Sequence, residues 1–155
     1  MGTVCVWVVF LQQDAEHLLR LGLAVACGFA VGVNRLHASH SHPGRVRVHV
    51  LVALSACLFA LAAGGDANAT SRAIQGVATG VGFLGAGEIL VEPRQGKHTT
   101  PVVRGLTSAA VVWFTAALGI TAGVASPFLA GMALLLALLT LSGPLPPQPP
   151  SKPQS

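Results

Sequence analysis

Five apolar segments, separated by short polar stretches, are the feature that most constrains this chain. They cover residues 18–34, 50–63, 73–91, 103–121 and 124–141. Only the third and fourth come comfortably close to the roughly 20 residues that a transmembrane helix needs. Because a backbone in lipid must satisfy its hydrogen bonds within each segment, and the alternation of a β-barrel is absent, we expect helices. The sequence predicts an all-α, polytopic membrane helical bundle of about five transmembrane helices.

The scarcity of charge supports a membrane location. Of the 155 residues, 52% are hydrophobic and 9% are charged, against about a quarter charged in soluble domains. The net charge of +4 is scattered over short loops, which argues against nucleic-acid binding. The cysteines Cys5, Cys27 and Cys57 lack metal or redox spacing and are expected to be small packing residues. No catalytic arrangement of side chains appears, so we do not expect an enzyme.

The basic residues predict an orientation. With the N-terminus outside, the inner loops and tail carry seven of them and the outer side carries two, Arg20 and Arg72. Since cytoplasmic loops are enriched in Lys and Arg, we expect the N-terminus outside and the C-terminus inside. Residues 1–15 are interpreted as a non-spanning lead-in and 16–142 as the transmembrane domain. The proline-rich residues 143–155 are interpreted as a disordered cytoplasmic tail.

The third segment is unusually rich in glycine. Residues 80–85 match GxGxxG, but they lie inside a membrane-length run without the strand and later acidic residue of a dinucleotide site. Glycine in a bilayer lets helix backbones approach closely. At about 100° per residue the glycines fall on two opposite faces, so we expect this helix to pack on both sides at the centre of the bundle. The glycines are Gly76, Gly80, Gly82, Gly85 and Gly87. The pairs Gly28/Gly32 and Gly119/Gly123 are expected to offer matching grooves on the first and fifth helices.

Two motifs in this region resemble a known family. GVGFLGAGEIL (80–90) and GLTSAAVVWFTAALGITAG (105–123), which includes Gly105, Thr107 and Trp113, are similar to the paired signature of the MgtC/SapB membrane proteins. The resemblance covers about residues 16–142 and includes Asp66 before the third helix and Arg72 at its start. The sequence departs from the family at Asn34, Arg45 and Gly76. We also expect the protein to lack the soluble C-terminal domain of the best-known members.

The resemblance implies a multi-pass protein of the bacterial plasma (inner) membrane that is associated with magnesium homeostasis. It implies a regulator that contacts another membrane complex, such as the ATP synthase, or alternatively a Mg²⁺ or H⁺ transporter. A purely structural membrane protein is the third hypothesis. No cofactor is expected, apart from Mg²⁺ as an ion that the protein would handle. The expected partners are the bilayer and either a second copy or a membrane complex.

The acidic residues carry open alternatives. Asp66 is a weak candidate for attracting Mg²⁺, or it caps the third helix or pairs with Arg72. Glu88 is the one carboxylate well within an apolar run, and intramembrane acids suggest ion or proton handling. Alternatively, its carboxylate reaches the inner interface or pairs with Arg94 or Arg104.

The remaining polar side chains have local interpretations. Trp113, in the middle of the fourth segment, is expected to hydrogen-bond inside the bundle. Thr107 and Ser108 are expected to bond to backbone carbonyls of their own helix. We interpret His37, His40, His42 and His49 as solvated residues of the first inner loop rather than as a metal or pH-sensing site.

Overall fold

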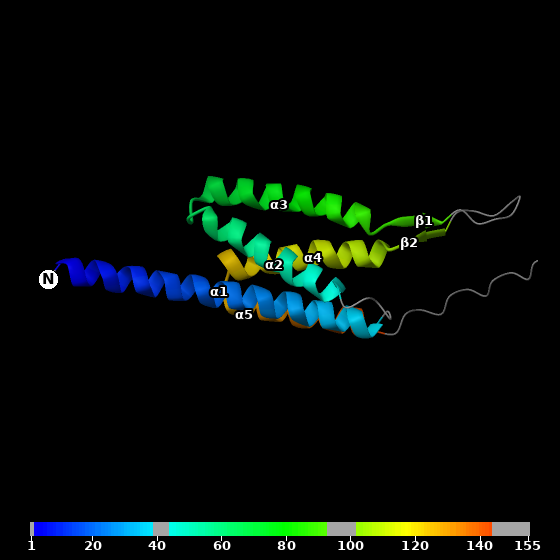
Figure 1. The fold of residues 1–155 in the computed structure, drawn as a ribbon, viewed down its shortest axis with the longest axis horizontal. Coiled ribbons are helices and arrows are strands. Elements are labelled where there is room, and N and C mark those ends of the chain that lie inside the picture. Colours follow the sequence, from blue (N-terminus) through cyan, green and yellow to red (C-terminus); the bar gives the residue numbers. More distant parts are fainter. Residues whose placement is uncertain (1, 39–43, 93–101, 144–155) are drawn as a thin grey trace, which may run out of the picture.

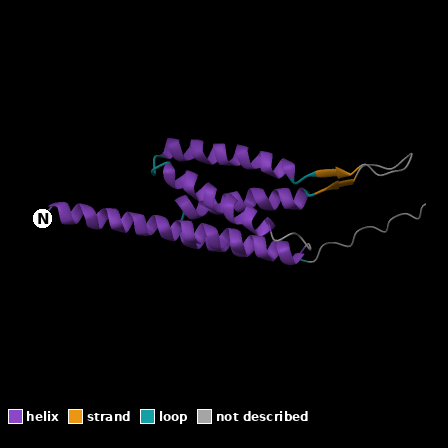
Figure 2. Cartoon of the chain, viewed as in Figure 1, coloured by secondary structure: helices purple, strands orange, loops and turns teal. Residues whose placement is uncertain are grey.

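Five helices and one short hairpin make up the described part of the chain (Figures 1 and 2). The computed structural model describes residues 2–38, 44–92 and 102–143, with side chains described from Gln12 onward except at 38, 90–92, 102 and 104. The helices are α1 (Gly2–Ala38), α2 (Gly44–Ala62), α3 (Ala67–Gly87), α4 (Leu106–Val124) and α5 (Pro127–Ser142). Strands β1 (Leu90–Glu92) and β2 (Val102–Arg104) pair antiparallel between α3 and α4. The predicted helical bundle is confirmed, with the hairpin as an addition.

Three of the described helices are long and apolar enough to cross a membrane. They are the stretch Gln12–His37 of α1, the whole of α2 and the whole of α4. Helix α5 is apolar but has only 16 residues. Helix α3 has 21 residues but is not among the three, because its first turns carry Asn68, Ser71, Arg72 and other polar side chains. Each of the five apolar segments therefore contains a helix, but the helices are not equally suited to lipid.

The ends of the helices differ from the predicted ends. The predicted non-spanning lead-in, residues 1–15, is helical from Gly2 onward and continues into the rest of α1 without a break. Helix α3 ends at Gly87, and the end of the third segment forms β1 instead. The return from β2 into α4 passes through Gly105, whose φ of 91° is left-handed. A Cβ at this position would overlap the Glu88 carbonyl oxygen, so the junction requires glycine. The predicted tail from residue 144 onward lies outside the described residues.

The centre of the bundle is formed by α1, α2 and α4. Gly28 of α1 lies so close to α2 that a Cβ there would be 2.7 Å from the His49 carbonyl oxygen. Gly119 of α4 lies equally tightly against the Ala53 backbone, also on α2. Cys27, Val31, Cys57 and Leu118 are fully buried between the helices, which confirms the packing role predicted for two of the cysteines. The expected close packing at Gly28/Gly32 and Gly119/Gly123 is present, but the second pair belongs to α4 and not to the fifth helix.

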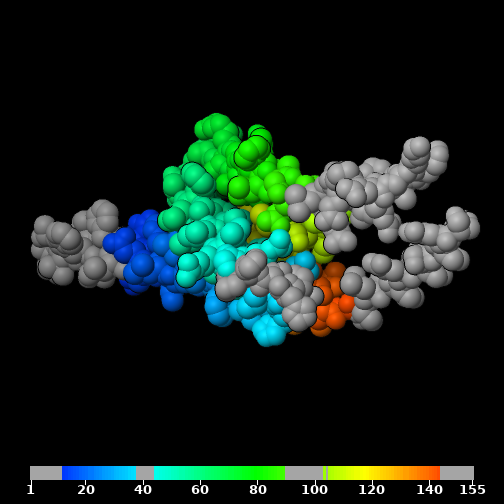
Figure 3. Space-filling view, turned by 45° about the vertical axis from the view of Figure 1, so that its right-hand side comes forward, coloured from blue at the N-terminus to red at the C-terminus, as the bar shows by residue number. Residues whose placement is uncertain are grey.

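The prediction that the glycine-rich helix is central is wrong. Helix α3 packs on α4 and less extensively on α2, and it forms a ridge along one side of the molecule (Figure 3). A Cβ added at four of its five glycines would meet no atom within 4 Å, these being Gly76, Gly80, Gly82 and Gly87. Only Gly85 lies against a neighbour, Ala109 of α4, at 3.6 Å. Glycine permits close approach, but in this fold α1, α2 and α4 form the centre through their own small residues.

Gly119→Ala is expected to lower the stability of the bundle by about 1–3 kcal/mol, because the new methyl group has no room beside the Ala53 carbonyl. Gly131→Ala on α5 is the matched control, since a Cβ there meets nothing within 4 Å and alanine favours helix. Thermal unfolding in detergent measures both. Equal stability of the two variants would contradict the close approach of α4 to α2.

Candidate functional site

Polar side chains from four helices meet at one end of the bundle, which we name the Arg45 end. Arg45 lies in the first turn of α2, and its Nη2 atom is 3.3 Å from Oε2 of Glu88 at the end of α3. Its Nη1 atom donates to Ser108 Oγ of α4 at 3.3 Å. Arg35, near the end of α1, donates to the same oxygen at 3.5 Å. Ser108 therefore accepts hydrogen bonds from two guanidinium groups on two other helices.

A buried histidine lies below this cluster. His49 is 5% exposed, and its Nδ1 atom is 3.2 Å from Oγ1 of Thr115. The Thr115 hydroxyl donates its proton to the Val111 carbonyl at 2.7 Å. Because a hydroxyl has only one proton, His49 Nδ1 must be the donor in the pair, which assigns the tautomer. A small cavity of about 20 Å³ joins His49 to the cluster above, enough for a single water molecule.

The ion pair at the Arg45 end orients the helices more than it stabilises them. The Arg45 and Glu88 side chains are 44% and 29% exposed, and pairs with this much solvent access contribute about 1 kcal/mol or less. The cluster does, however, connect the first turn of α2, the last turns of α1 and α3, and the first turn of α4. It therefore constrains where these helix ends lie relative to one another.

The opposite end, which we name the Arg20 end, has its own polar contact. Arg20 of α1 pairs with Glu16 at 2.7 Å and donates to the carbonyl oxygens of Gly123 and Ala125. These carbonyls are at the C-terminus of α4, where backbone acceptors lack partners within the helix and carry partial negative charge. Arg20 thus joins α1 to α4 at this end, as the arginine pair on Ser108 does at the other.

Asp66 is the N-cap of α3. Its carboxylate accepts a hydrogen bond from the Ala69 backbone N–H at 2.7 Å, the geometry expected of an aspartate cap. Arg72 is exposed one turn further on, and it is not an ion-pair partner of Asp66 among the described side chains. In this part of the chain, no group of three His, Cys, Asp or Glu side chains is placed to hold a metal ion. Ion binding by Asp66 stays a prediction.

Glu88 pairs with a residue that the sequence did not suggest. Its partner is Arg45 of α2, whereas Arg94 lies outside the described residues and the side chain of Arg104 is not described. Glu88 follows the last residue of α3 as its C-cap, so the carboxylate is at a helix end and not within a lipid-facing turn. The carboxylate is thus paired, but with a different arginine from the two predicted, and its position relative to the membrane interface stays a prediction.

Three other expectations need correction. Trp113 is 52% exposed on the outside of α4, so its ring faces away from the bundle interior. Ser108 bonds to arginines of other helices instead of only to its own backbone. His49 is buried within α2, whereas His37 bonds locally to Val33. His40 and His42 lie outside the described residues, and Thr107 is exposed.

The cluster formed by Arg35, Arg45, Ser108 and His49 was not predicted, although the positions of its charged residues in the sequence contain a signal for it. Arg35 follows the first apolar segment, Arg45 lies in the loop before the second, and Glu88 lies one turn before the end of the third. The predicted topology places all three positions on one side of the membrane. Charged residues at such positions tend to pair with one another. The prediction missed the pairing because it considered only partners near Glu88 in the sequence.

Thr115→Val is expected to lower the free energy of unfolding by about 1–3 kcal/mol, because it leaves the buried His49 N–H without its acceptor. Thr121→Val is the matched control, since Thr121 makes the same bond to the carbonyl four residues earlier but has no histidine partner. Thermal unfolding in detergent compares the two. An equal loss in both would mean that the contact with His49 contributes nothing.

Comparison with known proteins supports the resemblance. A model of the MgtC family matches residues 21–145. The chain is 44% identical over 147 residues to Protein SrpB of Synechococcus elongatus, covering 88% of this chain and 80% of SrpB. It is 37% identical over 122 residues to YhiD of Escherichia coli K12, named a putative magnesium transporter, covering 72% of this chain and 52% of YhiD.

A third relative is Protein MgtC of Salmonella typhimurium, 31% identical over 109 residues, which are 70% of this chain and 43% of that protein. The chain thus spans most of SrpB but about half or less of YhiD and MgtC. No solved structure matches. The family model covers most of the chain, including all of α2, α3, α4 and α5 and both signature motifs. The protein is a membrane helical bundle that belongs to the MgtC family.

Proposed function

We propose that this is a multi-pass protein of the bacterial plasma membrane that takes part in magnesium homeostasis by contacting another membrane protein complex, without enzyme activity of its own. The link to magnesium rests on relatives whose names are MgtC and putative magnesium transporter YhiD. The ATP synthase, which the family resemblance suggests, is the first complex to test.

The observation that carries this proposal is the outward face of α3. Gln75, Thr79, Gly82 and Ala86 follow one another at helical spacing and are all exposed. The hydroxyl of Thr79 donates to the Gln75 carbonyl at 2.9 Å, and the Gln75 amide donates to Ser71 Oγ at 3.4 Å. This face therefore consists of small residues and polar side chains, and the Gln75 side-chain oxygen is an acceptor that a partner can use. Lipid tails gain little from such a face, whereas a second helix can approach it closely and bond to its side chains. A protein partner is thus the better match than lipid.

Gly82→Leu is expected to prevent recovery of the partner complex, because the larger side chain on the outward face of α3 blocks close approach of a helix. Gly131→Leu on α5 is the matched control, since both glycines have open space around the added Cβ. Mild crosslinking in cells followed by purification and identification of ATP synthase subunits measures the effect. Equal recovery with the wild type and both variants would contradict contact through this face.

Transport of Mg²⁺ is the second candidate, and the name of YhiD is what favours it. Among the described residues, Asp66 caps α3 through one carboxylate oxygen and Glu88 pairs with Arg45, so both carboxylates already have a protein partner. If the regulatory proposal is correct, purified protein in liposomes that contain a fluorescent Mg²⁺ reporter gives no influx above protein-free vesicles. Influx that is lost in Asp66→Asn or Glu88→Gln would instead establish transport.

The orientation is supported by the separation of the arginines. Arg35 and Arg45 lie at the end of the bundle where α1 ends and α2 begins, whereas Arg20 contacts the far end, at the C-terminus of α4. We therefore expect the Arg45 end to be cytoplasmic. A phosphatase reporter fused after Ser155 should be inactive, since this enzyme requires the periplasm, and a cytoplasmic fluorescent reporter should be active. The reverse pattern would overturn the orientation.

A further inference from the structure

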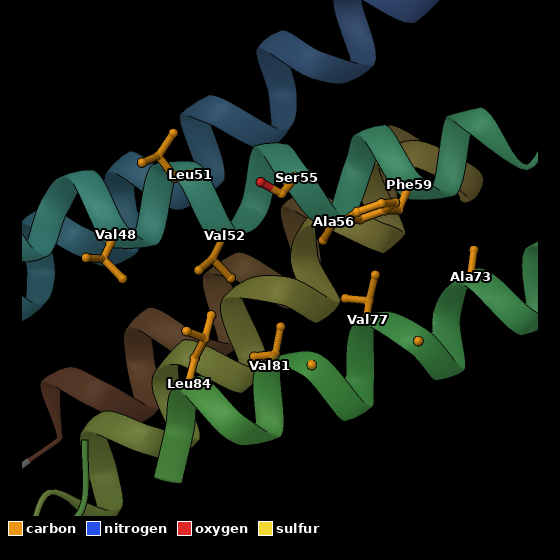
Figure 4. A pocket seen from close by; sticks show the side chains of 12 residues that line it. Val48, Leu51, Val52, Ser55, Ala56, Phe59, Ala73, Val77, Val81 and Leu84 are labelled. Carbon is orange, nitrogen blue, oxygen red and sulfur yellow. The ribbon is translucent and has the colours of Figure 1, made fainter. Parts of the chain in front are cut away.

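An open apolar groove runs between α2 and α3, on a different side of α3 from the outward face described above. It has a volume of about 710 Å³, and its lining is apolar except for Ser55 (Figure 4). The large side chains along it stay open to the outside, with Leu51 at 60% and Phe59 at 61% exposed. Gly76 and Gly80 form part of its floor, and a Cβ at either would meet no atom within 4 Å. The groove is open at this point because these two glycines have no side chain.

The length of the groove matches that of one acyl chain. Its lining extends from Val48 to Phe59 on α2 and from Ala73 to Leu84 on α3. Eleven steps along a helix rise about 16 Å, and half of the hydrocarbon core of a membrane is about 15 Å. A transmembrane helix of a partner would need a surface about twice as long. An acyl chain, whose length sets the thickness of half of this core, needs only this length.

The groove ends at the polar cluster. Val48 lines both the groove and the small cavity at the Arg45 end. Arg45 precedes Val48 by one turn of α2, and Glu88 follows Leu84 by one turn of α3. Since the cluster combines two guanidinium groups with one carboxylate, its formal charge is positive. An apolar groove about as long as an acyl chain, with positive charge at one end, is complementary to a lipid with a negative headgroup.

Arg45 has the capacity to bind such a headgroup. Its contacts with Glu88 and Ser108 use two of the five N–H donors of a guanidinium, and its side chain is 44% exposed. Phosphate oxygens are strong acceptors for arginine. We propose that the α2–α3 groove binds one acyl chain of an anionic phospholipid, whose phosphate is held by Arg45. This inference does not rest on the proposed function, because it concerns another surface of α3.

The test measures retention of phosphatidylglycerol and phosphatidylcholine by the purified full-length protein, using native mass spectrometry from detergent with equal amounts of both lipids. We expect phosphatidylglycerol to be bound about fivefold more strongly. Arg45→Gln should abolish this preference and Arg45→Lys, which keeps the charge, should retain most of it. Thermal unfolding of the same samples confirms that the variants are folded.

Variants of α3 distinguish the groove from general lipid adhesion. Gly80→Leu fills the groove and should lower phosphatidylglycerol retention several-fold, whereas Gly82→Leu on the outward face and Gly131→Leu on α5 should leave it unchanged. Equal retention of both lipids by the wild type, or an equal effect of all three leucines, would overturn the proposal. If Gly80→Leu changed the dimer fraction and left lipid retention unchanged, the groove would be a contact between copies and the proposal would be wrong. If only Gly82→Leu loses the partner complex, that result bears on the proposed function and not on lipid binding.

Discussion

The close approach of α2 to both α1 and α4 is the contact on which the rest of the structure depends. In a bilayer, apolar side chains gain little by leaving lipid for protein, so helices associate through van der Waals contact at short range and through polar bonds. Gly28 on α1 and Gly119 on α4 bring two backbones against α2. Once these three helices are in contact, α5 packs against α1 and α4, and α3 packs mainly against α4.

Polar contacts at the two ends then determine the register of this centre. Arg20 donates from α1 to the last carbonyls of α4, and Ser108 at the first turn of α4 accepts from Arg35 and Arg45. Helix ends carry the unsatisfied backbone groups and partial charges of the helix, so charged side chains are least costly there. Between the two ends, the bond of His49 to Thr115 is a buried polar contact between α2 and α4. A slip of α4 along its axis would break contacts at both ends together.

Helix α3 differs from the others because three sides of it face different surroundings. One side, with Val81 and Gly85, is buried in the bundle. A second, with Gly76 and Gly80, opens onto the apolar groove, and the third carries exposed Gln75 and Thr79. A peripheral helix with few packed side chains can exchange its neighbours at little cost. This is why we assign both proposed contacts, with a protein partner and with a lipid, to α3 and not to the tightly packed centre.

The sequence alone determined that the chain is a helical membrane bundle, because long apolar segments with few charges have no other stable arrangement in lipid. It also predicted the close helix contacts at Gly28 and Gly119, because these depend on small residues. The N-cap role of Asp66 was one of its predicted alternatives, because a cap depends only on a short stretch of chain. The position of α3 and the partners of Glu88 and Ser108 were decided only by the tertiary structure. A glycine pattern indicates that another helix can approach closely, but it does not indicate whether a helix lies against that face. A charged residue at a helix end finds its partner on whichever helix end lies nearest in space, and residues 45 and 88 are separated in sequence by most of α2 and all of α3.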